Sequence, residues 1–256
     1  MAFKGLDITG KVALVTGGNG GIGLGMADAM AQAGANIVIW GTNAEKNARA
    51  EAQLKAHGVK VLAQKIDVSQ EQQVIDGFAK AVATMGQVDN VVANAGIGLG
   101  APAFTALTAE NFRAVMAVNL DGAFFTLREA ARHMTSRSGG GSLVGMASLA
   151  AMMGAPRNQA YAASKGALIS MINGLAVELA RYEIRANVIL PGWIATDMSM
   201  PLQQSKTFNE KAIGRVPMRR WGQPEDFGGL AVYLASDASR FHTGDKFVID
   251  GGYAMF

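Results

Sequence analysis

Tyr161 and Lys165 are the two residues whose types and spacing suggest proton transfer. The run 158–181 around them is rich in Ala, Leu, Ile and Met and lacks proline, which predicts a long helix. Residues four apart share a helix face, so the phenol and the ammonium would be neighbours. In a partly desolvated site the ammonium favours the phenolate, and moving the tyrosine pKa from ~10 to ~7 takes about 4 kcal/mol. Such a phenol would exchange a proton with a carbonyl or carbinol oxygen; the alternative is a surface tyrosine above a surface lysine.

Ser148 adds a hydroxyl to this pair. It ends an apolar run, 142–148, that reads as a buried strand, and it lies 13 residues before Tyr161. The carboxyl end of a strand faces the crevice where open parallel sheets bind ligands. There the hydroxyl would donate a hydrogen bond to a substrate oxygen. The alternative is a serine that caps a helix or braces a turn.

A glycine-rich turn at 16–23 predicts a dinucleotide site. It follows a short apolar strand, 12–15, and precedes an Ala- and Met-rich helix, 22–33. Glycines let the backbone approach a pyrophosphate, and the helix N-terminus supplies free N–H groups. The spacing from Gly17 is Gly-x-x-x-Gly-x-Gly rather than the common Gly-x-Gly-x-x-Gly, and an ordinary tight turn is the alternative. Combined with the Tyr–Lys pair, the turn indicates hydride transfer, and a positively charged nicotinamide would favour the phenolate further.

Apolar strands and amphipathic helices alternate through the first half of the chain. Further strands are predicted at 36–40, 59–66 and 88–93, and helices at 44–56 and 70–85. This alternation implies a parallel sheet with helices on both faces. We therefore predict an α/β fold: one doubly wound Rossmann-type domain spanning 1–256, with a seven-stranded, mainly parallel sheet in the order 3-2-1-4-5-6-7.

Composition narrows the possible partners. The 256 residues include no Cys and only three widely separated His, so neither a disulfide nor a metal site is expected. The first residues contain no long apolar segment, so no signal peptide or membrane span is expected and the cytoplasm is the expected location. The net charge is only +3. A cluster of Arg215, Arg219 and Arg220 favours a solvated or substrate-flanking loop over a nucleic-acid site.

Taken in order and spacing, these motifs resemble those of the classical short-chain dehydrogenase/reductase family, from Leu6 to Tyr253. The segment 118–122 resembles the element that carries the family's catalytic asparagine, and 244–252 resembles its closing strand. The catalytic set that the resemblance implies is Asn119, Ser148, Tyr161 and Lys165.

The resemblance also implies which residues hold a dinucleotide. The turn, an adenine-contacting segment, the Asn-Ala-Gly element and a loop that touches the nicotinamide all have counterparts here. The implied cofactor-binding residues are Gly17, Asn19, Gly20, Gly21, Ile22, Gly23, Thr42, Asn43, Asp67, Val68, Asn94, Ala95, Gly96, Tyr161, Lys165, Pro191, Gly192, Ile194 and Thr196. Structural alternatives remain for three of the implied catalytic and cofactor-binding residues: Asn94 bracing the turn, Asn119 bonding backbone within its helix, and Asp67 capping the next helix.

The end of the second strand bears on the choice between NAD and NADP. Family members that prefer NAD usually carry a carboxylate where Gly41 falls, and those that prefer NADP often carry an arginine where Thr42 falls. This chain has neither. Gly41 removes an acid that would repel a 2′-phosphate, and Thr42 and Asn43 offer donors to one, so the sequence leans slightly toward NADP.

The resulting hypothesis is an NAD(P)-dependent oxidoreductase that interconverts a secondary alcohol and a ketone, with Tyr161 as general acid/base. Substrates resembling 3-oxoacyl thioesters compete with sugars, polyols and cyclic alcohols. One rival is a non-catalytic dinucleotide-binding protein, which the complete catalytic set disfavours. The other is an epimerase or dehydratase, which the short C-terminal region disfavours.

The substrate and the assembly remain the least defined features. Substrate determinants are expected at 96–104, 149–158 and 193–220, the last a lid in which Met198, Met200, Pro201 and Leu202 line an apolar pocket or pack a lid helix. The helices at 109–133 and 158–181 carry more apolar surface than one sheet face covers. By resemblance they pair across a two-fold axis, and the expected partner is a second copy in a homotetramer.

Overall fold

A seven-stranded sheet forms the centre of the computed structural model, which describes residues 4–255. Its order is β3-β2-β1-β4-β5-β6-β7, as predicted, and every strand pair is parallel rather than only most of them. The strands are β1 Val12–Thr16, β2 Asn36–Gly41, β3 Val61–Lys65, β4 Asn90–Ala93, β5 Gly141–Met146, β6 Ile184–Pro191 and β7 Lys246–Ile249.

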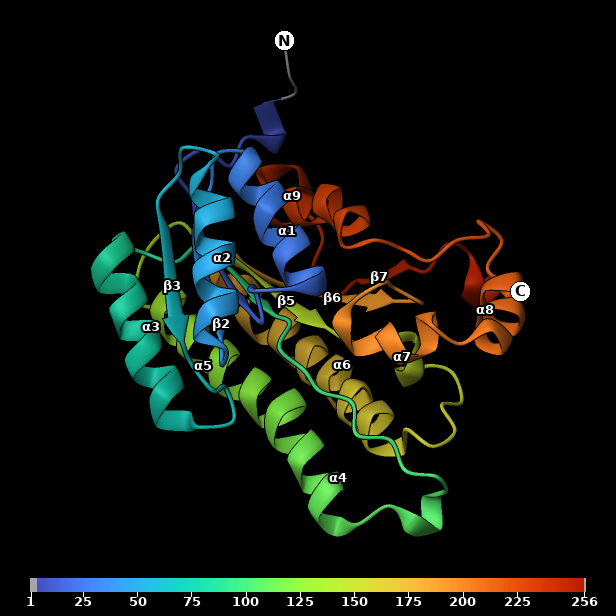
Figure 1. Cartoon of the computed structure of the whole chain (residues 1–256). Helices are drawn as coiled ribbons and strands as arrows, with labels where there is room; N and C mark the ends of the chain where they lie inside the picture. Colours follow the sequence, from blue (N-terminus) through green and yellow to red (C-terminus); the bar gives the residue numbers. More distant parts are fainter. Residues whose placement is uncertain (1–3, 256) are drawn as a thin grey trace.

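Helices cover both faces of this sheet, so the fold has three layers (Figure 1). One core cluster joins the sheet to α3 (Glu71–Met85), α5 (Gly122–Thr135) and α6 (Gln159–Leu179). The other joins the opposite face to α1 (Gly21–Gln32), α2 (Ala44–Lys55) and α9 (Gly228–Ala235). Burial on both faces explains why β1 and β4 read as continuous apolar runs rather than alternating ones.

The strand order reverses between β1 and β4, which are neighbours in the sheet. The connections leaving these two strands run to opposite sides, so a crevice opens beyond their carboxyl ends, where open α/β sheets bind ligands. The glycine-rich turn follows β1 and the Asn94-Ala95-Gly96 segment follows β4, so the two motifs meet at this point.

The predicted helix 109–133 is not regular. It consists of α4 (Ala109–Met116), a π-helical turn (Ala117–Asp121) and α5. Such a turn inserts an extra residue into the helix and is frequent at functional sites. Here it carries Asn119, whose side chain is fully buried. Hydrophobic periodicity predicted the helix but gave no signal for the π turn.

Other boundaries differ by a few residues. The strand predicted at 142–148 ends at Met146, so Ser148 lies two residues beyond it, and β3 and β4 are shorter than predicted. The predicted lid, 193–220, contains two short helices, α7 (Met200–Gln203) and α8 (Lys206–Ala212), which extend past the end of β6 (Figure 1). Within 4–255, the structure has no helix long and apolar enough to span a bilayer.

Candidate active site

Tyr161 and Lys165 lie on the first two turns of α6, beside the end of β5. Lys165 is 2% exposed, and its Nζ donates a 2.7 Å hydrogen bond to the carbonyl of Met146. The same Nζ lies 5.6 Å from the centroid of the Tyr161 ring. The predicted pairing across one helical turn is therefore present, and the last carbonyl of β5 fixes the ammonium.

Burial changes the ionisation of both groups. It lowers the pKa of Lys165 to about 8. It also raises the pKa of Tyr161, and a hydrogen bond with Ser148 offsets part of that rise. The expected lowering of the Tyr161 pKa by Lys165 is therefore wrong for the chain alone. The physical reason is that desolvation of the phenolate outweighs an ammonium that is bonded to Met146 and lies beside the ring.

Ser148 has the capping role that the sequence left open, and its role toward a substrate oxygen stays a prediction. Its Oγ accepts a 3.2 Å hydrogen bond from the N–H of Ala150 and so caps a short 3-10 turn, Leu149–Ala151. Its hydroxyl also lies close enough to the phenol of Tyr161 to lower the pKa of that phenol. The turn thus holds the serine against the tyrosine, where both oxygens can contact one substrate oxygen.

Asn119 braces the floor of the site. Its Oδ1 accepts from the N–H of Ile97 at 2.8 Å, and its Nδ2 donates to the Ile97 carbonyl at 3.0 Å and to Ser164 Oγ at 3.1 Å. These partners lie outside the helix that carries Asn119, so the alternative that its side chain bonds backbone within that helix is wrong. A Cβ built at Gly96 would lie 3.3 Å from Asn119 Oδ1 and 3.4 Å from Lys165 Nζ, so these three residues converge.

The glycine-rich turn fits a phosphate group. A Cβ built at Gly20 meets nothing within 4 Å, so this glycine borders open space. Gly20 precedes α1 and its lack of a side chain leaves the first N–H groups of that helix without a side-chain cap. A helix of this length with uncapped first-turn amides attracts an anion. Gly21 begins α1 with a positive φ of 52°. A Cβ at Gly21 would lie 3.2 Å from the side chain of Thr196.

Asn94 braces the glycine-rich turn, which was the alternative to a direct contact with the cofactor. Its Nδ2 donates a 2.9 Å hydrogen bond to the Thr16 carbonyl, while Thr16 Oγ1 accepts from the N–H groups of Asn94 and Ala95. A Cβ at Gly17 would lie 2.9 Å from Asn94 Nδ2, and one at Gly23 would overlap it. Gly17 and Gly23 are therefore required by the packing of the chain itself.

The end of β2 is closed by amide side chains. Asn19 Nδ2 donates a 2.7 Å hydrogen bond to Asn47 Oδ1, and this pair lies over Gly41, where a Cβ would overlap the Asn19 amide. Asn43 Oδ1 caps α2 by accepting from the N–H of Lys46. Thr42 is exposed. Neutral donors thus border the place where a carboxylate or an arginine would select between the two dinucleotides.

Lys46 forms an ion pair beside the glycine-rich turn that the sequence did not predict. Its Nζ pairs with Asp197 Oδ2 at 2.6 Å, which joins the first turn of α2 to the start of the lid. Asp197 directly follows Thr196, which faces the glycine-rich turn. A lone lysine three residues after Asn43 carries no motif, so nothing in the sequence links it to a residue 151 positions later.

The remaining predicted cofactor residues lie around this crevice. Asp67 accepts from Ser69 in a local turn and caps no helix, because α3 begins at Glu71. Val68 is buried against Gly122, so its side chain belongs to the core. Ile194 is likewise 6% exposed, and the predicted adenine and nicotinamide contacts of these segments stay predictions. Ile22 packs beside the core, Pro191 ends β6, and Gly192 follows it and packs against Asp250.

This arrangement is suited to moving a proton at one substrate oxygen. A partly buried phenol, a hydroxyl and a buried ammonium lie near the end of β5, and the uncapped N-terminus of α1 follows β1, two strands away. NAD(P) would be held by the glycine-rich turn and would supply or accept the hydride when bound. No group of three His, Cys, Asp or Glu within 4–255 is arranged to hold a metal ion.

Known proteins share both the sequence and the fold. The model of a family described as Enoyl-(Acyl carrier protein) reductase matches residues 17–254. Gluconate 5-dehydrogenase of Gluconobacter oxydans is 36% identical over 97% of this chain and 96% of its own length. NADP-dependent (R)-specific alcohol dehydrogenase of Lentilactobacillus kefiri is 37% identical over 96% of this chain and 97% of its own.

A solved structure of a gluconate 5-dehydrogenase from Burkholderia cenocepacia, in complex with NADP and tartrate, superposes with a TM-score of 0.94. It is 35% identical and the match covers 99% of this chain and 98% of that one. Matches of this extent, together with the strand order and the Ser–Tyr–Lys geometry, establish the relationship. The chain belongs to the classical short-chain dehydrogenase/reductase family and is an NAD(P)-dependent oxidoreductase acting on CH–OH groups.

Proposed function

We propose that Tyr161 is the general acid/base that exchanges a proton with the oxygen of a secondary alcohol or ketone. The observation that carries this is the meeting of Tyr161, Ser148 and Lys165 at one strand end. Ser148 holds the substrate oxygen, and Lys165 binds the nicotinamide ribose and supplies positive charge toward the phenolate. Asn119 positions the loop after β4 and holds a water that connects Lys165 to solvent.

The proposed cofactor site is the crevice between the glycine-rich turn and residues 191–196. We propose that both dinucleotides bind and that NADP is modestly preferred. Neutral donors at Asn19 and Thr42 tolerate a 2′-phosphate, and no carboxylate stands at Gly41 to repel one. Relatives named for NADP or solved with it support this preference.

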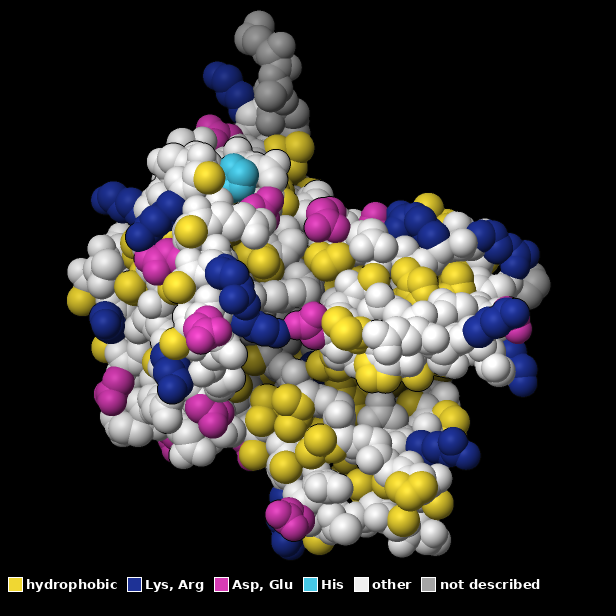
Figure 2. Space-filling view, in the orientation of Figure 1, with side chains coloured by type: hydrophobic (Ala, Val, Ile, Leu, Met, Phe, Trp, Pro, Cys, Tyr) yellow, Lys and Arg dark blue, Asp and Glu magenta, His cyan; other side chains and the backbone are white. Residues whose placement is uncertain are grey.

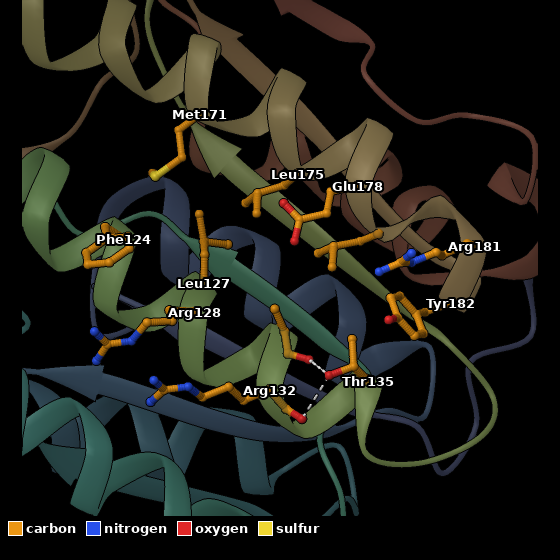
Figure 3. A pocket seen from close by; sticks show the side chains of 12 residues that line it. Phe124, Leu127, Arg128, Arg132, Thr135, Met171, Leu175, Glu178, Arg181 and Tyr182 are labelled. Atoms are coloured by element: carbon orange, nitrogen blue, oxygen red, sulfur yellow. Dashed lines mark hydrogen bonds between the residues drawn. The ribbon is translucent and has the colours of Figure 1, made fainter.

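The proposed assembly is a homotetramer. A groove of about 510 Å³ lies between α5 and α6 and is lined by apolar side chains, with Glu178 beside Leu175 and three arginines farther out (Figure 3). Arg128, Arg132 and Arg181 face it together with Glu178. A two-fold axis would set arginines of one copy against the glutamate of another and cover Phe124 and Met171, which suits a self-complementary interface.

The second interface of this tetramer is proposed at the region of β7, where Phe241 and Val248 are exposed. We also propose that 1–256 acts as one catalytic domain and works in the cytoplasm. These two proposals rest on the sequence expectations given above.

Tyr161→Phe tests the catalytic assignment. It removes the proton donor while keeping the ring, so turnover should fall by at least ~10²-fold, whereas the Kd for NADPH should stay within about twofold. Turnover is followed by NADPH absorbance and binding by calorimetry. Tyr233→Phe on α9, outside the site, is the matched control and should keep full activity. Near-normal turnover of Tyr161→Phe would falsify the assignment.

Lys165→Met tests the buried ammonium through the pH dependence of stability. The pKa of Lys165 is lowered from 10.5 to about 8, so between these values the unfolded chain binds the extra proton. Stability contributed by this residue therefore rises with pH across that window, by about 3 kcal/mol in total. Urea unfolding measures the free energy of unfolding of both proteins at pH 7 and pH 10. The difference, wild type minus variant, should be larger at pH 10 than at pH 7 by about this amount. An equal stability difference at both pH values contradicts the assignment.

Gly41→Asp tests the choice of dinucleotide. The new carboxylate would face the 2′-phosphate, so the ratio of Kd for NADPH to Kd for NADH should rise by at least ~10-fold. Any side chain here displaces Asn19, so Gly41→Ala is the control that moves Asn19 without adding charge. If the alanine variant changes the ratio as much as the aspartate variant, charge is not the cause. Exclusive binding of NADH by wild type would contradict the preference itself.

Light scattering tests the assembly. At micromolar concentration the expected mass is about four times the 26.7 kDa of one chain. Met171→Glu places a charge at the apolar centre of the groove and should lower the mass by at least half. A fully active monomer would overturn the proposal, and an unchanged mass for the variant would place the interface elsewhere.

A further inference from the structure

Large apolar side chains are exposed on the three loops that follow β4, β5 and β6. These loops, 96–104, 149–158 and 193–220, leave the same edge of the sheet as the catalytic residues. The first two are joined by a 3.0 Å hydrogen bond from Ala101 N–H to the Arg157 carbonyl. The exposed side chains range from 36% to 66% accessible and are Leu99, Phe104, Met152, Met198, Met200, Leu202 and Met218.

Polar side chains are missing from the parts of these loops nearest the catalytic serine and asparagine. Residues 97–104 read Ile-Gly-Leu-Gly-Ala-Pro-Ala-Phe, and residues 149–156 read Leu-Ala-Ala-Met-Met-Gly-Ala-Pro. Neither stretch has a side chain that can donate or accept a hydrogen bond. Any substrate placed between them meets hydrocarbon, thioether or backbone.

Three polar side chains of the lid bond mainly within the lid or to the residue that follows it. Ser199 Oγ donates to the Ile194 carbonyl, and Gln203 Nε2 donates to the Thr196 carbonyl. Asn209 binds backbone carbonyls with its Nδ2 and receives Trp221 Nε1 on its Oδ1. These bonds shape the lid backbone, whereas Met198, Met200 and Leu202 neither pack inside it nor lie buried. The space-filling view shows apolar surface on both sides of the hollow between the lid and the lower helices (Figure 2).

Such walls discriminate strongly between carbonyl compounds. A polyol would lose water from each hydroxyl without gaining a side-chain partner, and unpaired buried polar groups are unfavourable. An apolar chain gains from every methylene that it buries. Methionines adapt their shape to different apolar groups, so several of them favour breadth rather than one fixed shape.

We propose that the substrate is a ketone or secondary alcohol whose body is apolar, an alkyl or aryl-alkyl compound that lies between these loops. This inference rests on the proposed function of Tyr161 and specifies the substrate class for that site. It departs from the sugar-acid names of several relatives and agrees with the alcohol dehydrogenase relative. In the reduction, the ketone carbon would receive a hydride from NADPH, which becomes NADP+, and the ketone oxygen would receive the proton of Tyr161.

A homologous series tests the substrate class. With saturating NADPH, kcat/KM for 2-butanone, 2-hexanone and 2-octanone should rise by about fourfold for each methylene added, the factor for burying one such group. 5-Ketogluconate should be at least ~10²-fold poorer than 2-octanone. A flat series, or better turnover of 5-ketogluconate, overturns the substrate class while leaving hydride transfer intact. NADPH binding with no turnover of any of these ketones counts against the proposed function as well.

Matched leucine variants test the loops. Leu99→Gln and Leu202→Gln should each flatten the chain-length series and leave the Kd for NADPH within about twofold. Leu6→Gln is the control, because Leu6 is 41% exposed, close to the 36% and 37% of the other two, and precedes β1 at the opposite edge of the sheet. If all three variants keep the wild-type series, or if the loop variants change only the oligomeric mass, the apolar loops do not bind substrate.

Discussion

The buried ammonium of Lys165 is the constraint on which the site depends. A charge taken out of water is unfavourable by several kcal/mol unless hydrogen bonds hold it, and Lys165 is 2% exposed. Lys165 is held by a hydrogen bond to the carbonyl of Met146, the last residue of β5. The first turns of α6 must therefore pack beside the end of that strand. Gly145, one residue earlier, lets Leu168 and Ile172 approach the strand, with a Cβ at that position only 3.1 Å from Ile172. The contact that packs α6 against β5 therefore also places the Lys165 ammonium at the Met146 carbonyl.

Glycines around the crevice divide into two kinds. A side chain at Gly23 or Gly192 would overlap or crowd neighbouring atoms of the chain, so these positions are small because the fold demands it. A side chain at Gly20 would meet only open space. The fold gives no reason for glycine there, whereas a phosphate approaching the amides of α1 does. Among the glycines around the crevice, Gly20 is therefore the one that most directly indicates a bound ligand.

Local patterns predicted much of the fold, and tertiary contacts account for what they missed. Hydrophobic periodicity and the glycine-rich turn predicted the strand order, and the four-residue spacing predicted that Tyr161 and Lys165 are neighbours. The π turn at Asn119 and the ion pair of Lys46 with Asp197 were not predicted. Both depend on partners distant in sequence, for which no spacing rule exists. The direction of the Tyr161 pKa was wrong because desolvation is a property of the packed site, not of the pair.

Chemistry and specificity are built from different parts of this molecule, which explains how similar chains act on dissimilar substrates. Strand ends and the start of α6 carry Tyr161, Lys165 and the glycine-rich turn, and nearly the whole chain superposes on a gluconate 5-dehydrogenase with a TM-score of 0.94. The loops after β4, β5 and β6 leave the sheet at the edge where Ser148 and Tyr161 lie. Loop side chains can change without disturbing the sheet, and relatives 36% to 37% identical to this chain are named for gluconate, L-rhamnose and alcohol dehydrogenases, so identity at this level does not specify the substrate. A sugar acid needs donors on those loops, and at 97–104 and 149–156 this chain has none among its side chains.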